Sequence, residues 1–161
     1  MLVASASSAA LADDHFEHRG SLGLLVSAGG EYRSAISALS VTENGPRANF
    51  DLGGTLAFSA QWSLLLEGRL TLGGFTPAVA FFGGLRNHWG QQFKTFFDLT
   101  LGVHALPSFS IGPRVAFGVQ YELSPVIGVY ALIGAQFGGG AALRFGAEMM
   151  IGVQFRSYLF E

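Results

Sequence analysis

The sequence lacks cysteine altogether and carries few charges. The 161-residue chain is 12% charged, with a single lysine and a formal net charge of −2, whereas an average globular chain is about 25% charged. The absence of cysteine excludes a disulfide-stapled mini-protein, and the shortage of positive charge argues against a nucleic-acid partner. At 50% hydrophobic residues, the chain does not have the composition of a disordered protein. Because a soluble domain needs polar residues over its surface, part of this surface is expected to avoid water.

Long hydrophobic runs suited to a helix are also missing. The longest stretch without a charged residue, Leu123–Leu143, has the length of a membrane-spanning helix but contains Pro125 and the run Gly138–Gly140. Proline and glycine disfavour helix interiors and favour turns. No other charge-free stretch reaches the roughly 18 residues that a spanning helix needs, so a helical membrane protein is disfavoured.

The sequence does show a regular alternation. Hydrophobic residues alternate with small or polar ones, as Leu64 and Leu66 do with Ser63 and Glu67, and this period of two indicates β-strands with two different faces. The pattern predicts eight strands, at Gly20–Arg33, Asn49–Ala60, Trp62–Gly74, Ala78–Arg86, Gln92–His104, Phe109–Glu122, Ile127–Phe137 and Ala142–Arg156. Their lengths suit tilted strands that cross a bilayer in about 9–11 residues.

The residue types on the two faces indicate which face is inside. One face is mostly Gly, Ala, Ser and Thr with one or two charges per strand, and the other is mostly Leu, Phe, Val and Ile. Small residues with a few charges suit the interior of a narrow barrel, and only lipid tolerates the large apolar residues outside. We therefore predict an all-β fold over residues 20–160, an eight-stranded antiparallel up-and-down transmembrane β-barrel. A soluble ligand-binding barrel, with the apolar face inside, is the less favoured alternative.

The charged residues of the predicted strands fall on the inward face and form an expected interior polar network. Counting along the strands places Glu31, Arg33, Asp51, His104 and Arg144 toward the outer rim, Glu67, Arg69, Asp98, Arg114 and Glu148 near mid-depth, and Arg86, Lys94, Glu122 and Arg156 toward the periplasm. Buried charges must be paired or hydrated, and arginine matches carboxylates well. The network is therefore interpreted as a salt-bridged plug, with a narrow polar path as the alternative.

Aromatic residues gather near the expected turns. With both termini on the periplasmic side, the predicted aromatic girdles consist of Trp62, Trp89, Phe93, Tyr121, Tyr158 and Phe160 at the periplasmic rim and of Tyr32, Phe50, Phe75, Phe109 and Phe137 at the opposite rim. Two such girdles, one hydrocarbon thickness apart, are typical of an outer-membrane barrel. Core aromatics that happen to fall near turns are the alternative interpretation.

The pattern resembles the small eight-stranded outer-membrane barrels of Gram-negative bacteria, the group of the OmpA transmembrane domain and OmpX. The likeness covers Gly20 to Phe160 and is architectural. Barrels of this group end in a terminal aromatic that the insertion machinery reads, and Phe155, Tyr158 and Phe160 resemble that signal, although Glu161 follows them. OmpX-like adhesion barrels raise long strands above the membrane, whereas only the connection Ser34–Pro46 is long here, which argues against adhesion. The resemblance implies a location in the bacterial outer membrane.

The N-terminal residues are interpreted separately from the barrel. Residues 1–12 are small and apolar and end in Ala10-Leu11-Ala12, which predicts the clipped end of a signal peptide; a flexible tail is the alternative. Residues 13–19 are then a periplasmic tail. Cleavage after Ala12 would place His15 third in the mature chain, where it resembles an amino-terminal Cu(II) or Ni(II) motif. A solvated tail is the favoured interpretation of that motif, and no metal or other cofactor is expected.

Catalytic motifs are weak. Eight-stranded barrels include enzymes that modify lipid A with Ser, His and an acid, but His104 is separated from Ser108 by a turn with proline, so no catalytic residues are assigned. The favoured function is a structural or partner-docking barrel that meets the lipid bilayer and other membrane or periplasmic proteins. A small pore, related in role to porins, is the alternative function.

Overall fold

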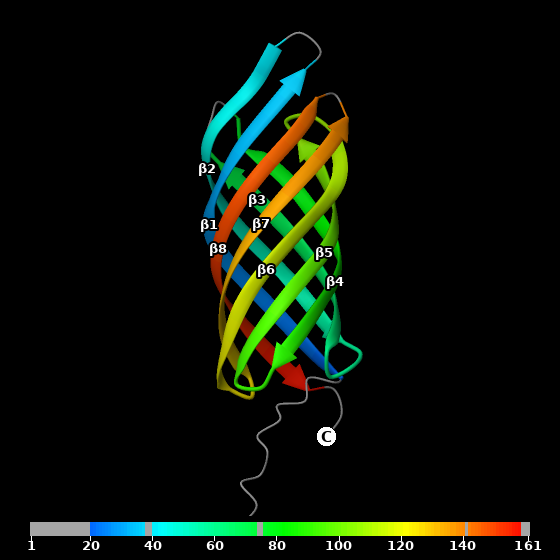
Figure 1. Cartoon of the computed structure of the whole chain (residues 1–161), viewed down its shortest axis with the longest axis vertical. Coiled ribbons are helices and arrows are strands. Elements are labelled where there is room, and N and C mark those ends of the chain that lie inside the picture. Colours follow the sequence, from blue (N-terminus) through cyan, green and yellow to red (C-terminus); the bar gives the residue numbers. More distant parts are fainter. Residues whose placement is uncertain (1–19, 38–39, 74–75, 141, 159–161) are drawn as a thin grey trace, which may run out of the picture.

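The fold consists of eight antiparallel strands that run up and down in chain order. The structure, a computed structural model, describes residues 20–37, 40–73, 76–140 and 142–158. The strands are β1 (Ser21–Ser37), β2 (Ser40–Ala57), β3 (Trp62–Leu72), β4 (Ala78–Gly90), β5 (Phe93–Leu106), β6 (Ser110–Ser124), β7 (Ile127–Gly140) and β8 (Leu143–Tyr158) (Figure 1). The residues predicted as signal peptide and periplasmic tail, among them His15, lie outside the described residues.

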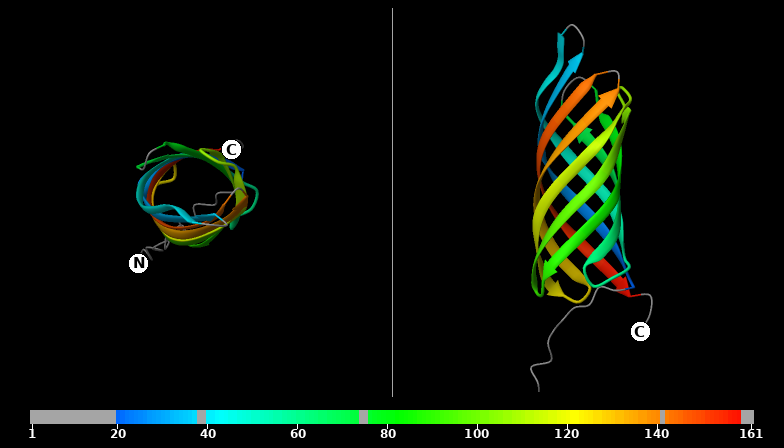
Figure 2. Two further views of the ribbon diagram at one scale, coloured as in Figure 1. Left: turned by 90° about the horizontal axis from the view of Figure 1, so that it is seen from above. Right: turned by 45° about the vertical axis from the view of Figure 1, so that its right-hand side comes forward.

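The sheet closes on itself. Each strand pairs with its neighbours in the chain, and β1 also pairs antiparallel with β8 from Ser21↔Tyr158 to Ile36↔Leu143. The ring is visible when the molecule is viewed along its axis (Figure 2). Closure leaves no unpaired sheet edge along the barrel wall, which satisfies the backbone hydrogen bonds as a bilayer requires. The predicted fold class is therefore confirmed.

The described residues contain no helix that is both long and apolar enough to cross a membrane.

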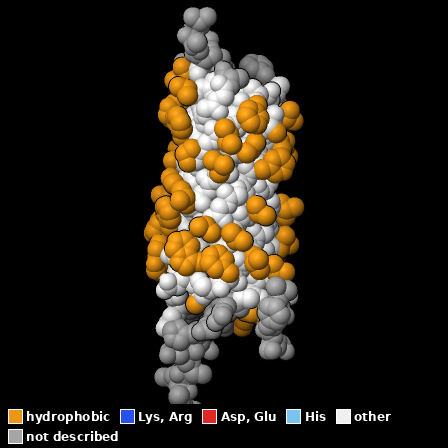
Figure 3. Space-filling view, turned by 90° about the vertical axis from the view of Figure 1, so that its right-hand side faces the viewer, with side chains coloured by type: hydrophobic (Ala, Val, Ile, Leu, Met, Phe, Trp, Pro, Cys, Tyr) orange, Lys and Arg blue, Asp and Glu red, His pale blue; other side chains and the backbone are white. Residues whose placement is uncertain are grey.

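Burial alternates along the strands, and the large apolar side chains point outward. Along β3, residues alternate between exposed and buried from Trp62 to Leu72, with Leu66 69% exposed. The face drawn in Figure 3 carries hydrophobic and uncharged side chains over the described wall. An apolar wall of this extent is an aggregation hazard in water and the normal surface of a barrel in lipid. The alternative of a soluble barrel, apolar inside and polar outside, is thus contradicted.

The hairpin of β1 and β2 is longer than predicted. The segment Ser34–Pro46 was expected to be a loop, but strand pairing continues through it to Ser37↔Ser40, with an irregularity between Ala35 and Ile36. This hairpin rises above the rest of the barrel (Figure 1). A strand that has left the membrane has water on both sides, so hydrophobic alternation no longer marks it. The sequence argued against an adhesion role because only one connection is long. That connection forms paired strands that rise above the barrel, so this argument no longer holds.

The strand ends define two ends of the barrel. We call the end with the β1–β2 hairpin the hairpin end. The opposite end, where β1 begins and β8 finishes, is the terminal end, and it carries the short turns Phe58–Gln61, Gln91–Gln92 and Pro125–Val126 (Figure 1). β4 also extends four residues further toward this end than predicted, to Gly90, which matters for the interior described next.

Candidate functional site

The barrel interior brings together the polar residues that the sequence pattern pointed inward. Every member of the expected network is buried, on strands β1 to β6 and β8. These members are Glu31, Arg33, Asp51, Glu67, Arg69, Arg86, Lys94, Asp98, His104, Arg114, Glu122, Arg144, Glu148 and Arg156. They divide by their contacts into a central cluster, a single pair, a terminal-end cluster and the hairpin-end mouth.

Arg69 is the hub of the central cluster. Its Nε and Nη2 donate to the two carboxylate oxygens of Asp51 at 2.8 and 2.7 Å, and its Nη1 donates to Glu148. The same Nη1 lies 3.6 Å from Oε2 of Glu31. The fork of a guanidinium matches a carboxylate in this two-bond arrangement, which makes it one of the stronger ion pairs available to proteins.

Arg114 extends the central cluster across the lumen. Its Nε donates to Glu148 Oε1 at 2.7 Å and its Nη1 to Glu67 Oε2 at 3.1 Å. Glu148 of β8 therefore binds the arginines of β3 and β6 together. The ring of Phe82 lies against both guanidinium groups, with its centroid 4.8 Å from Cζ of Arg69 and 5.0 Å from Cζ of Arg114. We define the central cluster as Glu31, Asp51, Glu67, Arg69, Arg114 and Glu148.

A layer of apolar side chains lies inside the barrel, and sequence analysis missed it. It consists of Leu25, Leu65, Phe96, Ala116, Tyr130, Leu132 and Met150. These residues point inward while their apolar neighbours point to lipid: Leu65 is 1% exposed and Leu66 69%, and Met150 is 1% exposed and Met149 66%. The available signal was the interruption of strict alternation by adjacent large apolar residues, as at Phe96-Phe97.

Two glycines make room for the rings of this layer. A Cβ at Gly118 would lie 2.3 Å from the Phe96 ring, and one at Gly152 would lie 2.6 Å from the Tyr130 ring. The rings of Phe96 and Tyr130 meet edge to face, with centroids 6.0 Å apart. Glycine at these two inward positions therefore lets large rings fill the lumen.

Arg86 and Asp98 form a separate pair on the apolar layer. Arg86 Nε and Nη2 donate to the Asp98 carboxylate at 2.6 and 2.7 Å. The guanidinium lies over the Phe96 ring at 4.1 Å and near the Tyr130 ring at 5.6 Å. Cation–π contacts of this kind add to the ion pair where water is excluded.

The terminal-end cluster surrounds Glu122. Arg156 approaches both oxygens of Glu122, at 2.5 and 2.8 Å, and Nζ of Lys94 lies 3.5 Å away. Gln120 and Gln154 continue the network, and Gln154 donates to Thr55 at 2.8 Å. We define this cluster as Thr55, Lys94, Gln120, Glu122, Gln154 and Arg156.

The order of inward residues along the strands places the apolar layer between the two clusters. On β8, Met150 lies between Glu148 of the central cluster and Gln154 of the terminal-end cluster. On β6, Ala116 lies in the same way between Arg114 and Gln120. Because both strands run the length of the barrel, the lumen contains a central ion-paired tier, an apolar tier with the Arg86–Asp98 pair packed on it, and a terminal-end polar tier.

The predicted three-layer grouping of charges is wrong in two places. Asp98 and Arg86 were assigned to different layers but are direct cross-strand partners. Asp51 and Arg69 were also separated and are likewise direct partners. Both errors arise because two strands are longer than predicted: β4 continues to Gly90 and β2 begins at Ser40. The depth of each charge, counted from the predicted strand ends, was therefore shifted.

The aromatic residues of the predicted girdles point outward where they are described. Tyr32, Phe50, Trp62, Trp89, Phe93, Phe109, Tyr121 and Phe137 are exposed, and Tyr158 is half-buried. Phe93 pairs across strands with Tyr121, and the Tyr158 hydroxyl donates to the Pro125 carbonyl at 3.0 Å. Phe75 and Phe160 lie outside the described residues.

His104 and Ser108 are not arranged as a catalytic pair. His104 is buried with its ring edge-on to Phe82, at 5.9 Å between centroids. The Ser108 hydroxyl accepts a hydrogen bond from Arg144, and within the described part of the chain none joins it to His104. The described residues also contain no group of three or more His, Cys, Asp or Glu placed to hold a metal ion.

Comparison with known proteins identifies the fold but not a family. No protein-family model matches the chain, and no curated protein sequence matches it. Among solved structures, the N-terminal β-barrel domain of Pseudomonas aeruginosa OprF matches with a TM-score of 0.61 at 10% identity, over 86% of this chain and 98% of that one. The P. aeruginosa outer membrane protein OprG matches at 0.55 and 10% identity, over 90% and 100%. A de novo designed transmembrane β-barrel matches at 0.55 and 16% identity, over 86% and 97%.

These likenesses place the protein in one structural class. Its fold is that of the small eight-stranded transmembrane β-barrels found in bacterial outer membranes. A designed barrel shares this fold, so the architecture by itself carries no particular activity.

The central cluster generates a stability prediction. Glu148→Gln removes the charge that neutralises both Arg69 and Arg114, and breaking a buried ion pair from one side costs about 3–5 kcal/mol. We expect a loss of this size in the free energy of unfolding, measured by denaturant titration of the barrel in lipid vesicles. The matched control Glu67→Gln affects a carboxylate whose ion pair, within the described residues, is with Arg114 alone, and it should cost less. Equal costs for the two variants would contradict the role of Glu148 as the shared counter-ion.

Proposed function

We propose that the protein is an integral barrel of the bacterial outer membrane with a sealed interior and a structural or partner-docking role. The observation that carries the proposal is the apolar layer of Leu25, Leu65, Phe96, Ala116, Tyr130, Leu132 and Met150, stacked between two ion-paired clusters. Eight strands leave an interior that side chains can fill. In this assignment the terminal end faces the periplasm and the hairpin end faces the outside.

The composition of the tiers supports sealing over conduction. An ion that crossed the lumen would lose its water at the apolar layer, where Arg86 and Asp98, which pack against it, already neutralise each other. It would also have to displace Arg69 or Arg114 from carboxylates that hold them by short, buried hydrogen bonds. Both steps are costly in a low-dielectric interior. Catalysis is not part of the proposal, because no hydrogen bond joins His104 and Ser108 within the described residues.

Conductance tests this function directly. In a planar lipid bilayer, the purified barrel is expected to give no discrete current steps, because the apolar layer excludes hydrated ions. The triple variant Leu65→Ala, Phe96→Ala, Met150→Ala should open small conductance steps. The matched control Leu64→Ala, Phe97→Ala, Met149→Ala removes the outward neighbours of the same residues and should stay silent.

Regular current steps from the unmodified barrel would contradict the sealed interior and favour the alternative, a small pore for ions or solutes. Gel migration before and after heating checks that each variant has folded.

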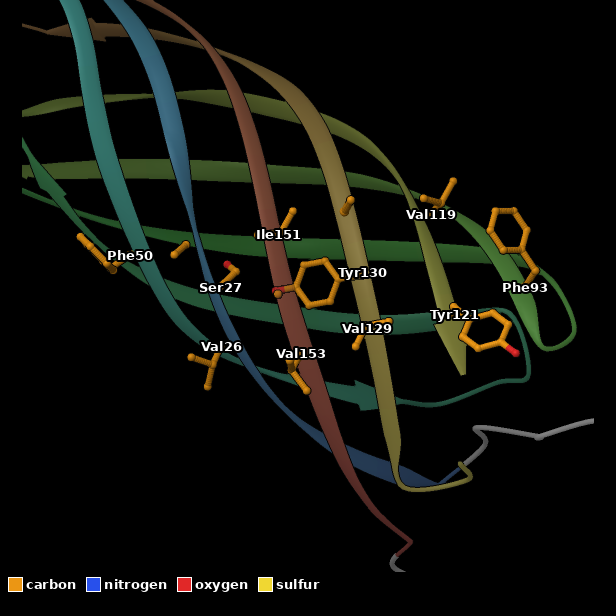
Figure 4. Close-up of a pocket in the computed structure, with 13 residues that line it drawn as sticks. Val26, Ser27, Phe50, Phe93, Val119, Tyr121, Val129, Tyr130, Ile151 and Val153 are labelled. Atoms are coloured by element: carbon orange, nitrogen blue, oxygen red, sulfur yellow. The ribbon is translucent and has the colours of Figure 1, made fainter. Parts of the chain in front are cut away.

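The docking role is supported by a groove on the lipid-facing wall. The groove has a volume of about 710 Å³ and crosses β1, β8, β7 and β6 between Phe50 and Phe93. Small residues such as Ala28, Ala131 and Gly152 leave a depression in the outer surface there. The inward ring of Tyr130 forms part of its floor (Figure 4). Small residues let another transmembrane element approach closely, which is how protein surfaces associate inside lipid.

Site-specific photo-crosslinking tests docking. A photoreactive residue in place of Ala131, in the groove, should give a discrete protein adduct in native membranes, since a docked partner lies within reach. The same residue in place of Leu101, which is exposed on β5 away from the groove, should give lipid adducts alone. Identical adduct patterns at the two positions would remove the groove as a docking surface and leave the structural role.

A further inference from the structure

The hairpin-end mouth of the lumen concentrates positive charge that the sealing function does not use. Arg33 of β1 and Arg144 of β8 point inward there, both buried. His104 of β5 is buried there too, as the direct cross-strand partner of Ser110, whose hydroxyl Arg144 contacts. The mouth therefore collects cationic and hydrogen-bonding side chains from three strands that are far apart in the sequence.

Arg33 has donors without acceptors although it is almost completely buried. The side chain is 1% exposed, and among the described residues its Nε and Nη1 have no hydrogen-bond partner. Its Nη2 lies 2.5 Å from Glu31 Oε1 without making a hydrogen bond. A buried guanidinium with unsatisfied N–H groups is costly to the fold. The Nε–H and Nη1–H groups, which point to different sides of the guanidinium, each mark a position for an acceptor that carries negative charge.

The carboxylates near the mouth are already engaged. Glu31 Oε2 accepts hydrogen bonds from Asn49 at 3.0 Å and from Gln136 at 2.9 Å, and it also faces Arg69. Asp51 is occupied by the two-bond pair with Arg69. Glu31 is therefore one carboxylate shared between Arg33 and the central cluster, and it does not satisfy the guanidinium of Arg33 by itself.

Hydroxyl groups complete the mouth. Arg144 reaches from β8 past β7 to Ser110 of β6, where its Nη1 donates to the Ser110 hydroxyl at 3.3 Å, and it also donates to Ser108. This crossing is open because the intervening inward residue of β7 is Gly138, whose Cβ would lie 3.3 Å from Ser110 Oγ. Serine hydroxyls can turn to donate to an anion.

We propose that the hairpin-end mouth binds a tetrahedral oxyanion, a phosphate or sulfate group. Arg33 donates to one of its oxygens through Nε or Nη1, because Nη2, which both two-bond edges of the guanidinium share, already lies beside Glu31. Arg144, the two serine hydroxyls and His104 line the remaining sides. The phosphate could be a free inorganic ion or the headgroup of a phosphorylated lipid at the membrane surface, and the chemistry of recognition is the same. The site does not depend on whether the barrel is sealed.

Calorimetric titration with inorganic phosphate tests the site. The folded barrel in an uncharged detergent is expected to bind phosphate saturably, one per barrel. Hydrogen bonds to charged groups are among the stronger ones in proteins, so Arg33→Gln should weaken phosphate binding by about tenfold or more. The control Lys94→Gln removes the same charge at the terminal end, where Lys94 lies near Glu122, and should leave phosphate binding unchanged.

A second variant and a folding assay separate a loss of phosphate binding from a failure to fold. Arg33→Lys keeps the charge and removes the planar fork, so it should also weaken phosphate binding, by less than Arg33→Gln. Heat-dependent gel migration reports whether each variant has folded. Absence of saturable phosphate binding by the unmodified barrel overturns the proposal without reference to any variant, and so does unchanged binding in folded Arg33→Gln.

The source of the anion is decided by reconstitution into vesicles. Vesicles of phosphatidylcholine alone are compared with vesicles that also contain phosphatidic acid, whose headgroup is a phosphate monoester. If phosphatidic acid blocks the binding of inorganic phosphate, the lipid headgroup occupies the site. If binding is the same in both vesicles, the site takes the free ion. Absence of phosphate binding in both vesicles and in detergent overturns the site.

Discussion

The rest of the structure depends on how charges are neutralised inside a narrow lumen. A charged group taken out of water is tolerable only when partners replace its hydration, and a guanidinium with one carboxylate removed is left at a cost of several kcal/mol. Glu148 meets this condition for two arginines at once, by accepting from Arg69 of β3 and Arg114 of β6. The contact joins residues 79 and 34 positions apart in the chain. It therefore forms only when all the strands between them are in register.

This requirement links the interior to the wall. A slip of one residue in any strand would move its charges into lipid and its leucines into the lumen. In the native register, Leu66 and Met149 face lipid while Glu67 and Glu148 face inward. The apolar layer adds a second constraint, since the rings of Phe96 and Tyr130 fit only because Gly118 and Gly152 have no side chains. Wall and interior thus specify the same register independently.

Much of this architecture could be predicted from the sequence, because alternation is a local property. The inward direction of Glu67 and Arg69 can be read from the leucines that flank them. The partners of Arg69 could not be predicted in the same way, since they are set by strand lengths and by the stagger between strands. An error of four residues at the end of β4 was enough to separate Arg86 from Asp98. Leu65 and Phe96 share the inward parity of Glu67 and Asp98, but their size and polarity are those of the lipid-facing residues, and composition alone therefore misassigns them.

The central claim is that ion-paired arginines fill the lumen and exclude water. It is tested most directly by the hydrogen exchange of arginine side chains, measured by NMR on the ¹⁵N-labelled barrel in micelles. The Nε–H groups of Arg69, Arg86 and Arg114 each donate to a buried carboxylate. The account predicts that these protons exchange with water far more slowly than in the same chain unfolded in urea. Exchange at the unfolded rate for all three would show a water-filled lumen and contradict the account.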